Sequence, residues 1–287
     1  NPEKAESFKQ EFGFEKAYGS YEELLADKDV QAVYIPLPND LHVKWVNEAL
    51  NAGKHVICEK PIGLNSGEIR EMFDTAKKNG VFLMEAYAYL HSPYVKSLKK
   101  DIADGVIGDV EYIETAFVTQ GYKEDIRLYK EHGGGAMYDL GCYCTTMIMS
   151  LVDSEPEFVN ACAEFTDLGV DSMTSAILRF KNGVRAMFNV GMVLGKDTDA
   201  RYDNLYIYGS KGFIKSEIAY NQPGDASYRI FTENGIIERK VSMPQNYSLE
   251  ITQMCKCIKG EATPYITEEF SLKNAALMER IFEKIGY

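Results

Sequence analysis

The sequence predicts an α/β protein in two parts, a parallel sheet with crossover helices and then an α+β domain with a large, mostly antiparallel sheet. Three observations indicate this. The first ninety residues alternate helix and strand patterns, later strands follow one another through short turns, and 287 residues with 45% hydrophobic content suffice for two ordinary domains. We expect one domain at residues 1–91 and the other at residues 92–287.

Helix starts and buried-type strands define the first part. Asn1 and Pro2 are favoured at a helix start, so a helix is expected as far as Gly13, and Ser20 to Glu23 form a capping-box pattern. Apolar runs indicate buried strands at 32–35, 55–58 and 81–84, with helices at 41–52 and 66–78. This alternation is typical of strands that run parallel.

The pattern changes at about residue 92. Helices are expected at 92–103 and 135–151, and two more, at 247–258 and 269–285, end the chain. The remaining segments predict strands at 110–118, 157–164, 172–180, 185–190, 201–208, 212–216, 227–232 and 236–241. Short turns with glycine, such as Lys-Asn-Gly at 181–183, join successive strands, so this sheet is expected to be mostly antiparallel.

The overall charge limits the partners. A formal charge of −12 and a pI near 4.9 exclude nucleic acid or an anionic membrane as the main partner, because either would be repelled over most of the surface. No apolar run approaches the roughly 20 residues of a membrane-spanning helix, so a cytoplasmic protein is expected. The six cysteines lack the C-x2-C spacing of zinc sites, so no metal is predicted.

Lys60 is the first candidate for chemistry. The run Glu59-Lys60-Pro61 comes directly after the predicted strand at 55–58, and open α/β sheets bind their ligands at the carboxyl ends of the strands. Pro61 restricts the backbone of Lys60, and Glu59 is close enough to orient its side chain. On this pattern alone, an ordinary surface lysine is an equally good interpretation.

The second candidate follows three glycines, 133–135, that lead into a predicted helix. Asp139 and Tyr143 are four residues apart and therefore share one helix face. A phenol with a pKa of about 10 becomes an acid/base at neutral pH only where a cation favours the phenolate. A tyrosine packed on a helix is the alternative for Tyr143, but Lys60 supplied by the other domain favours catalysis.

A strand-end turn contains the candidates for cofactor binding. Leu37, Pro38 and Asn39 follow the predicted strand at 32–35 and are placed to lie along a bound cofactor, together with Glu59 and Lys60. His42 belongs to the same group, although it could equally cap its own helix.

Three further residues are candidates for the substrate. Glu85 and Tyr87 follow the predicted strand at 81–84, where they could wall a substrate pocket or only fill the domain junction. Arg127, which precedes the glycine run, is the third.

Five motifs follow one another along the chain: Pro38-Asn39, His42, Glu59-Lys60-Pro61, Met84-Glu85-Ala86 and the glycine-rich helix start. In this order and spacing, they resemble the motifs of the Gfo/Idh/MocA oxidoreductase family over essentially the whole chain. The resemblance implies a Rossmann domain that binds NAD or NADP, and a second domain whose open-faced antiparallel sheet supplies the substrate site and often the contact of a homo-oligomer, a dimer or a tetramer.

The resemblance also assigns roles. The family's E-K-P lysine falls on Lys60, and its acid/base position in D-x-G-x-[HY] falls on Tyr143, with Asp139 as the aspartate of that motif. Tyrosine at this position is similar to the dihydrodiol dehydrogenase and glucose-fructose oxidoreductase branch. The expected reaction is hydride transfer between a nicotinamide and a secondary alcohol or ketone of a polyol, sugar or cyclic diol.

In family terms Asn1 falls just after the second Rossmann strand, so the Rossmann-type parallel sheet is expected to be incomplete at its N-terminus. The G-x-G-x-x-G spacing occurs nowhere in the chain, and the residue that distinguishes NAD from NADP would precede Asn1. The alternative interpretation is a truncated, redox-inactive form that acts as a binding or oligomerisation module.

Overall fold

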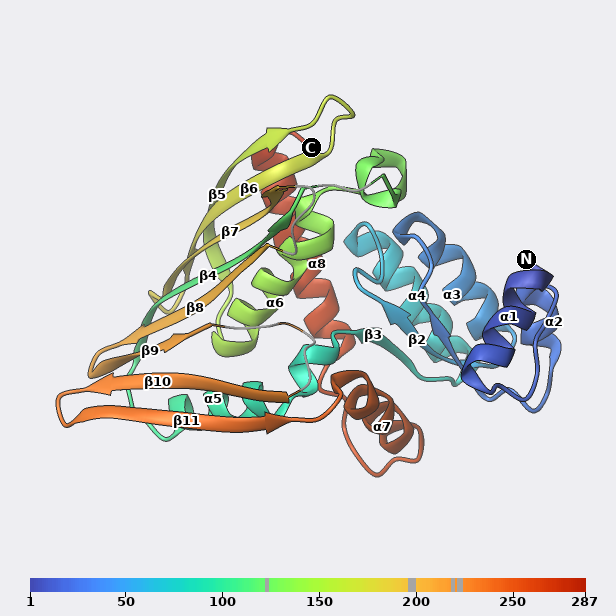
Figure 1. Ribbon diagram of the computed structural model, residues 1–287, viewed down its shortest axis with the longest axis horizontal. Coiled ribbons are helices and arrows are strands. Elements are labelled where there is room, and N and C mark those ends of the chain that lie inside the picture. The colour runs from blue at the N-terminus through green and yellow to red at the C-terminus, as the bar shows by residue number, and fades with distance from the viewer. Residues whose placement is uncertain (122–123, 196–199, 218–219, 221–223) are drawn as a thin grey trace.

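A computed structural model describes residues 1–121, 124–195, 200–217, 220 and 224–287, and shows two sheets with helices between and around them (Figure 1). The first sheet is parallel and contains β1 (Ala32–Ile35), β2 (His55–Glu59) and β3 (Leu83–Ala86) in that order. The second has eight strands. The predicted α/β class, with a parallel sheet before a large, mostly antiparallel one, is confirmed.

The helices of the first part begin where their capping residues predict. The N–H of Lys4 donates to Asn1 Oδ1 over 3.1 Å, and the N–H of Glu23 donates to Ser20 Oγ over 3.1 Å. These caps start α1 (Pro2–Phe12) and α2 (Tyr21–Ala26), and α3 (His42–Asn51) and α4 (Ser66–Asn79) follow, with a 3-10 turn η1 (Asn39–Leu41) before α3.

Parallel pairing brings the ends of the three strands to one edge. Ile35 pairs with Cys58 and Glu59 pairs with Ala86, so the segments after β1, β2 and β3 leave the sheet on the same side. The third strand begins two residues later than predicted, because the N–H of Val81 still donates to Ala76 at the end of α4. This edge carries the first group of candidate residues.

The large sheet has the order β11-β10-β9-β8-β4-β7-β6-β5, and all its pairs are antiparallel except β4 with β7. Its strands confirm the predicted segments: β4 (Val110–Gln120), β5 (Pro156–Phe165), β6 (Asp171–Phe180), β7 (Arg185–Leu194), β8 (Arg201–Gly209), β9 (Gly212–Ser216), β10 (Gly224–Thr232) and β11 (Gly235–Met243).

The helices that the structure describes cover one face of the large sheet. Figure 1 shows α6 (Cys142–Leu151) and α8 (Glu268–Ile285) between this sheet and the parallel sheet, with α5 (Pro93–Ala103) beside β11 and α7 (Asn246–Ile258) near β3. On the opposite face, Phe158 of β5 and Ile177 of β6 are 45% and 57% exposed. The sheet is therefore open-faced, as predicted.

Two hydrophobic clusters form the core. The larger one lies between the large sheet and its helices, and the smaller one surrounds the parallel sheet. Helix α8 joins the two, since its Ala275 belongs to the smaller cluster and its Glu279 accepts hydrogen bonds from the backbone N–H and hydroxyl of Ser66 at the start of α4. None of the helices among the described residues is both long and apolar enough to cross a membrane.

The helix predicted at 135–151 is not α-helical throughout. A π-helical turn, η5 (Met137–Gly141), precedes α6, and a 3-10 turn, η2 (Ala88–His91), follows β3. Gly135 has φ +101°, outside the helical region, so the helix begins after it. A helix is therefore present over nearly all of the predicted stretch, but its first turn is π-helical, which changes how Asp139 and Tyr143 are presented.

Candidate functional site

Lys60 reaches from the edge of the parallel sheet to the π-helical turn. It follows β2, and its Nζ donates to the backbone oxygen of Asp139 over 2.6 Å and to the Asp139 Oδ1 over 3.1 Å. Only 11% of the Lys60 side chain is exposed. The contact joins residues 79 positions apart and brings the predicted lysine and the predicted aspartate together.

Asp139 is held by a second cation. Arg127 Nε donates to Asp139 Oδ2 over 2.8 Å, and Arg127 Nη1 forms an ion pair with Asp125 over 3.0 Å. Burial alone would raise the pKa of Asp139, but the charges of Lys60 and Arg127 outweigh it and lower that pKa below its ordinary value. Asp139 is therefore ionised at neutral pH.

The same contact fixes the charge of Lys60. Burial by itself lowers the pKa of Lys60, and the carboxylate of Asp139 with its neighbours more than offsets that effect, so the pKa lies above the ordinary value. Lys60 is thus a buried, permanently charged ammonium group at neutral pH. Its Nζ lies 4.8 Å from the centre of the Tyr143 ring.

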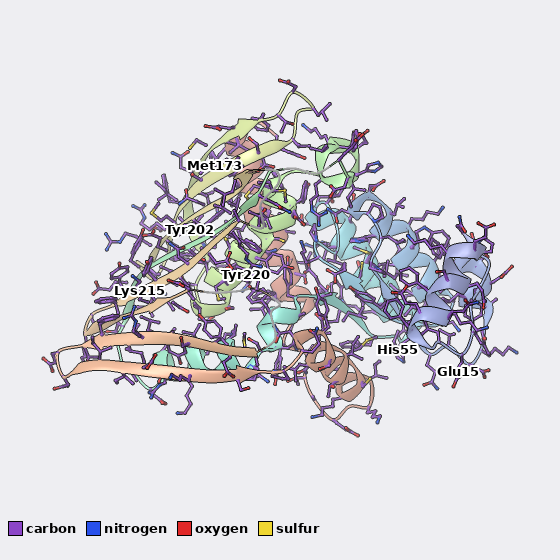
Figure 2. The ribbon with its side chains drawn as sticks, in the orientation of Figure 1. Glu15, His55, Met173, Tyr202, Lys215 and Tyr220 are labelled. Atoms are coloured by element: carbon purple, nitrogen blue, oxygen red, sulfur yellow. The ribbon has the colours of Figure 1, made fainter. Side chains whose placement is uncertain are left out.

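Tyr143 lies in the first turn of α6 within a cluster of aromatic rings. Its ring centre is 5.4 Å from that of Tyr89 and 5.5 Å from that of Phe117. Tyr220, labelled in Figure 2, stacks on Phe117 with ring centres 4.7 Å apart and also contacts Tyr143. The rings form one apolar wall next to the Lys60 ammonium group.

The pKa of Tyr143 differs from the prediction. Burial raises this pKa and the charge of Lys60 lowers it, and the net result lies above the ordinary value. The predicted effect of Lys60 is present in direction but is smaller than the effect of burial, which the sequence alone could not weigh. In this arrangement Tyr143 is a neutral phenol that can donate a proton.

The glycine run before the helix is required by close packing. A Cβ at Gly134 would collide with the backbone oxygens of Arg127 and Tyr129, and one at Gly135 would collide with the carboxylate of Asp171. That carboxylate accepts a hydrogen bond from the N–H of Met137 over 3.0 Å, so it caps the turn that carries Asp139. Sequence reasoning missed Asp171, which lies 32 residues after Asp139 and has no motif around it.

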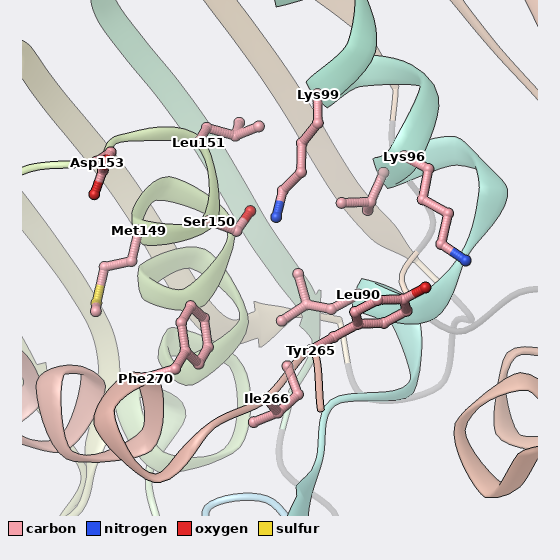
Figure 3. A pocket seen from close by; sticks show the side chains of 11 residues that line it. Leu90, Lys96, Lys99, Met149, Ser150, Leu151, Asp153, Tyr265, Ile266 and Phe270 are labelled. Carbon is pink, nitrogen blue, oxygen red and sulfur yellow. The ribbon is translucent and has the colours of Figure 1, made fainter. Parts of the chain in front are cut away.

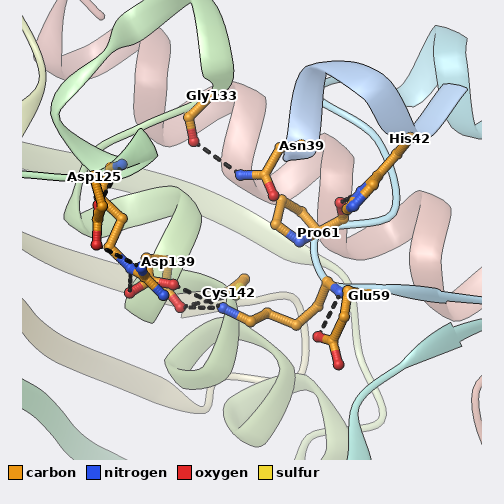
Figure 4. A network of polar contacts seen from close by, with 10 residues as sticks. Asn39, His42, Glu59, Pro61, Asp125, Gly133, Asp139 and Cys142 are labelled. Atoms are coloured by element: carbon orange, nitrogen blue, oxygen red, sulfur yellow. Dashed lines mark hydrogen bonds and ion pairs between the residues drawn. The ribbon is translucent and has the colours of Figure 1, made fainter. Parts of the chain in front are cut away.

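The residues predicted to lie along the cofactor hold the strand-end loops together. His42 is fully buried, and its two ring nitrogens lie 2.9 Å from the Pro61 oxygen and 2.8 Å from the Leu37 oxygen. Asn39 Nδ2 donates to the Gly133 oxygen over 2.9 Å, as Figure 4 shows. Pro38 precedes η1 at the same edge. Contact of these residues with a cofactor stays a prediction.

Two acidic residues lie near one another at this edge: Glu59, which precedes Lys60, and Glu250 of α7. One carboxylate oxygen of Glu59 accepts from the Tyr34 hydroxyl, and the other accepts from the Lys60 N–H over 3.2 Å. Glu250 of α7 is buried with an unpartnered Oε1 among the described residues, and burial with the charge of Glu59 raises the pKa of Glu250 to about 8. The sequence offered no signal for Glu250, since it lies in an ordinary amphipathic helix.

Glu85 and Tyr87, predicted to contact substrate, are buried at the junction with α8. The Glu85 carboxylate accepts from the Ile62 N–H over 3.0 Å and from the Ser271 hydroxyl over 2.5 Å. Tyr87 is fully buried, and its hydroxyl accepts from Asn274 Nδ2 over 3.2 Å. These contacts give both residues a role in fixing β3 against α8, and their contact with a substrate stays a prediction.

The edge of the parallel sheet fits the nicotinamide half of a dinucleotide in its chemistry. Lys60 is a cation, and Glu59 and, from α7, Glu250 carry carboxyl oxygens of the kind that accept from ribose hydroxyls, but contact of any of them with a dinucleotide stays a prediction. Among the described residues, no group of three or more His, Cys, Asp or Glu side chains is placed to hold a metal ion.

Comparison with known proteins decides the family. A model described as "Oxidoreductase family, NAD-binding Rossmann fold" matches residues 1–87, and the GFO/IDH/MocA C-terminal domain matches residues 95–215. The chain belongs to the Gfo/Idh/MocA family. The predicted NAD(P)-dependent oxidoreductase acting on CH–OH groups is thus confirmed, and the alternative function of a redox-inactive binding or oligomerisation module is not favoured.

Named relatives and solved structures agree with this assignment. The trans-1,2-dihydrobenzene-1,2-diol dehydrogenase of Oryctolagus cuniculus is 38% identical over 99% of this Gfo/Idh/MocA chain and 87% of its own. The D-xylose 1-dehydrogenase (NADP(+)) 2 of Haloferax volcanii is 28% identical, covering 98% and 86%. A 3-ketoreductase from Actinomadura kijaniata, solved with NADP and TDP-benzene, superposes with a TM-score of 0.90 at 27% identity, covering 99% and 87%.

Proposed function

We propose that this oxidoreductase interconverts a secondary alcohol and the corresponding ketone on a polyol, sugar or cyclic diol. The observation that carries the proposal is the position of the Lys60 Nζ, 4.8 Å from the Tyr143 ring centre and in contact with Asp139. A cation at the end of β2 and a phenol of α6 are thereby held next to each other. Such a pair can bind the oxygen of a reacting alcohol or ketone and move a proton to or from it.

Tyr143 is the proposed acid/base and Lys60 the group that stabilises charge on the reacting oxygen. Because burial raises the pKa of Tyr143, its phenol is protonated at neutral pH and is ready to donate to the oxygen of a ketone that is being reduced. Alcohol oxidation needs the phenolate, which the Lys60 ammonium stabilises. We therefore expect alcohol oxidation to accelerate as the pH rises and ketone reduction to be favoured at neutral pH.

Asp139 and Arg127 are proposed to position the lysine. Two contacts to Asp139 fix the Lys60 ammonium group, and Arg127 fixes the other oxygen of the same carboxylate. Arg127 is 44% exposed, so its guanidinium can also meet a substrate at the rim of the site. The aromatic wall of Phe117 and Tyr220 offers apolar faces to the C–H groups of a ring-shaped substrate.

The cofactor is assigned to residues 1–91 and the substrate to residues 92–287, which keeps the predicted domain boundary. When bound, the nicotinamide supplies or accepts the hydride, a reaction for which side chains have no equivalent. Leu37, Pro38, Asn39 and Glu59 are placed at the strand ends where the dinucleotide would lie, with His42 behind them holding two of these loops. The names of the relatives support sugars and diols as the substrate class.

The test follows cofactor absorbance at 340 nm with NAD+ and NADP+ over a panel of aldoses and trans-diols, including D-xylose. The Lys60→Ala variant is expected to lower turnover by about 10²-fold or more, because one preorganised cation at the reacting oxygen is lost. Lys44→Ala is the control, since Lys44 is exposed on α3 and contacts only Trp45 among the described rings. Wild-type turnover in Lys60→Ala would refute the assignment.

A homo-oligomer is proposed to cover the open face of the large sheet. Phe158, Ile177 and Tyr208 are exposed there, and an apolar sheet face of this kind is typical of an interaction surface. Light scattering after size exclusion measures the mass. A mass of about 32 kDa in solution would contradict the dimer or tetramer.

A further inference from the structure

A second pocket lies away from the reaction site, between α5, the end of α6 and the segment that leads into α8 (Figure 3). Its volume is about 520 Å³, and its apolar walls include Leu90, Ile266 and Phe270. None of Lys60, Asp139 and Tyr143 lines it. Ser150 of α6, which does, is seven residues beyond Tyr143, or about 10 Å along the helix.

Two lysines from one face of α5 line this pocket. Lys96 and Lys99 are three residues apart, so both side chains project from the same side of the helix. In the part of the chain that the structure describes, neither ammonium group forms an ion pair, whereas the adjacent Lys100 pairs with Asp104 over 2.6 Å. Asp153, the carboxylate in the lining, lies across the pocket from Lys96 in Figure 3.

The surroundings of the two lysines leave their charge uncompensated. Both side chains are exposed to water, and partial burial lowers the pKa of Lys99. The Nζ of Lys96 lies 5.0 Å above the ring of Tyr265, which contributes electron density but no negative charge. An anion bound between the two ammonium groups would supply a counter-charge to both of them.

A buried histidine packs against the pocket wall at Tyr265. His91 is 1% exposed, its ring centre lies 5.4 Å from that of Tyr265, and neither ring nitrogen has a hydrogen-bond partner among the described residues. Burial, with the charge of Lys96, lowers the pKa of His91 to about 4, so the imidazole is neutral and adds no charge of its own. The net charge of the pocket therefore comes from the two lysines and Asp153.

We propose that this pocket binds a small organic anion, with its phosphate or carboxylate between Lys96 and Lys99 and its apolar part against Leu90 and Phe270. Both the charged half and the apolar half of the ligand contribute to selectivity. A bare inorganic anion gains the two ammonium groups but leaves the apolar walls in water, and a neutral apolar molecule fills the walls but leaves the lysines unpaired. A ligand that combines both is required. The site is separate from the dinucleotide and substrate sites.

The test is calorimetric titration of the full chain with phenyl phosphate, and separately with benzoate, inorganic phosphate and phenol. We expect saturable binding of phenyl phosphate or benzoate that is at least about tenfold tighter than that of inorganic phosphate or phenol, because both halves of the pocket are then used. The stronger of the two aromatic anions identifies a phosphate or a carboxylate as the natural head group.

Variants on one helix provide matched controls. Lys96→Gln and Lys99→Gln are each expected to weaken binding about tenfold, whereas Lys100→Gln, which changes the adjacent exposed lysine, should change it less than about twofold. Lys60→Ala should leave binding unchanged, which separates this pocket from the reaction site. Binding that is insensitive to both Lys96→Gln and Lys99→Gln, or no saturation by either aromatic anion, would overturn the proposal.

Discussion

The Asp139→Asn substitution removes the charge that holds Lys60 and Arg127. At 3.1 Å, with an effective dielectric constant of about 20, the attraction between Lys60 Nζ and Asp139 Oδ1 is about 5 kcal/mol. Asparagine keeps one acceptor oxygen, and the backbone oxygen of residue 139 still accepts from Lys60, so part of the interaction survives. We expect Asp139→Asn to lower the free energy of unfolding by about 3 kcal/mol, as breaking one side of a largely buried ion pair does.

The loss of stability in Asp139→Asn should depend on pH, and the change in the pKa of Lys60 decides its direction. Without the carboxylate, burial dominates and the pKa of Lys60 falls below that of the unfolded chain. The folded variant then releases a proton that the unfolded chain retains, so the stability of the variant rises with pH. Its deficit relative to wild type is therefore largest at neutral pH and shrinks as the pH approaches 10, where the lysine of the unfolded chain also loses its proton.

Urea unfolding followed by circular dichroism at 222 nm, at pH 7 and pH 9.5, measures this effect. Asp125→Asn is the control, because Asp125 also pairs with Arg127, forms no hydrogen bond or ion pair with Lys60 among the described residues, and has a side chain that is 37% exposed. Asp125→Asn should lower the free energy of unfolding by less than about 1 kcal/mol. Equal losses in Asp139→Asn and Asp125→Asn, or a deficit that does not change with pH, would refute the reasoning.

Two further variants test the surroundings of the site. Glu250 has a pKa of about 8 in the folded chain, above its ordinary value of 4.5, so the folded state retains a proton and stability should fall as the pH rises between these values. Glu250→Gln should remove that contribution, which urea unfolding from pH 5 to 8 would show as a flatter curve than wild type, and parallel curves would contradict it. Gly134→Ala places a Cβ against the Arg127 and Tyr129 oxygens and should lower the free energy of unfolding by about 2 kcal/mol. Thermal unfolding measures this, and an unchanged melting temperature would show that the loop can shift to accommodate the Cβ.

Much of the fold could be predicted from local sequence signals. Caps at Asn1 and Ser20, the apolar run of β2 and the alternation of strands in the second part are each decided by residues close in the chain. Lys60 could be placed at the carboxyl edge of a parallel sheet for the same reason. The family resemblance then connected Lys60 with Tyr143, and the structure brings the two together.

The remaining features depend on contacts between distant residues. The π-helical turn is set by Gly135 and by the Asp171 carboxylate of β6, which no local pattern links to it. Strand alternation left open whether Glu85 and Tyr87 wall a pocket or fill the domain junction. Helix α8 packs on that end of β3 and buries both residues.

The pKa of Tyr143 illustrates the same limit in energetic terms. A lysine nearby predicts a lowered pKa, and the structure adds the aromatic wall that removes the phenol from water and outweighs the lysine. Pairing of charges can be guessed from motifs, whereas the degree of burial follows only from the packed chain.

The central claim is that Lys60 and Tyr143 act as one unit on the reacting oxygen. The most direct measurement is the single-turnover rate of hydride transfer, with a substrate from the aldose and diol panel, for Lys60→Ala, Tyr143→Phe and the double variant. The account predicts that each single variant loses about 10²-fold or more and that the double variant is little slower than the worse single one, as for residues that work together. Losses that multiply fully in the double variant would show that the two residues act independently and would contradict the account.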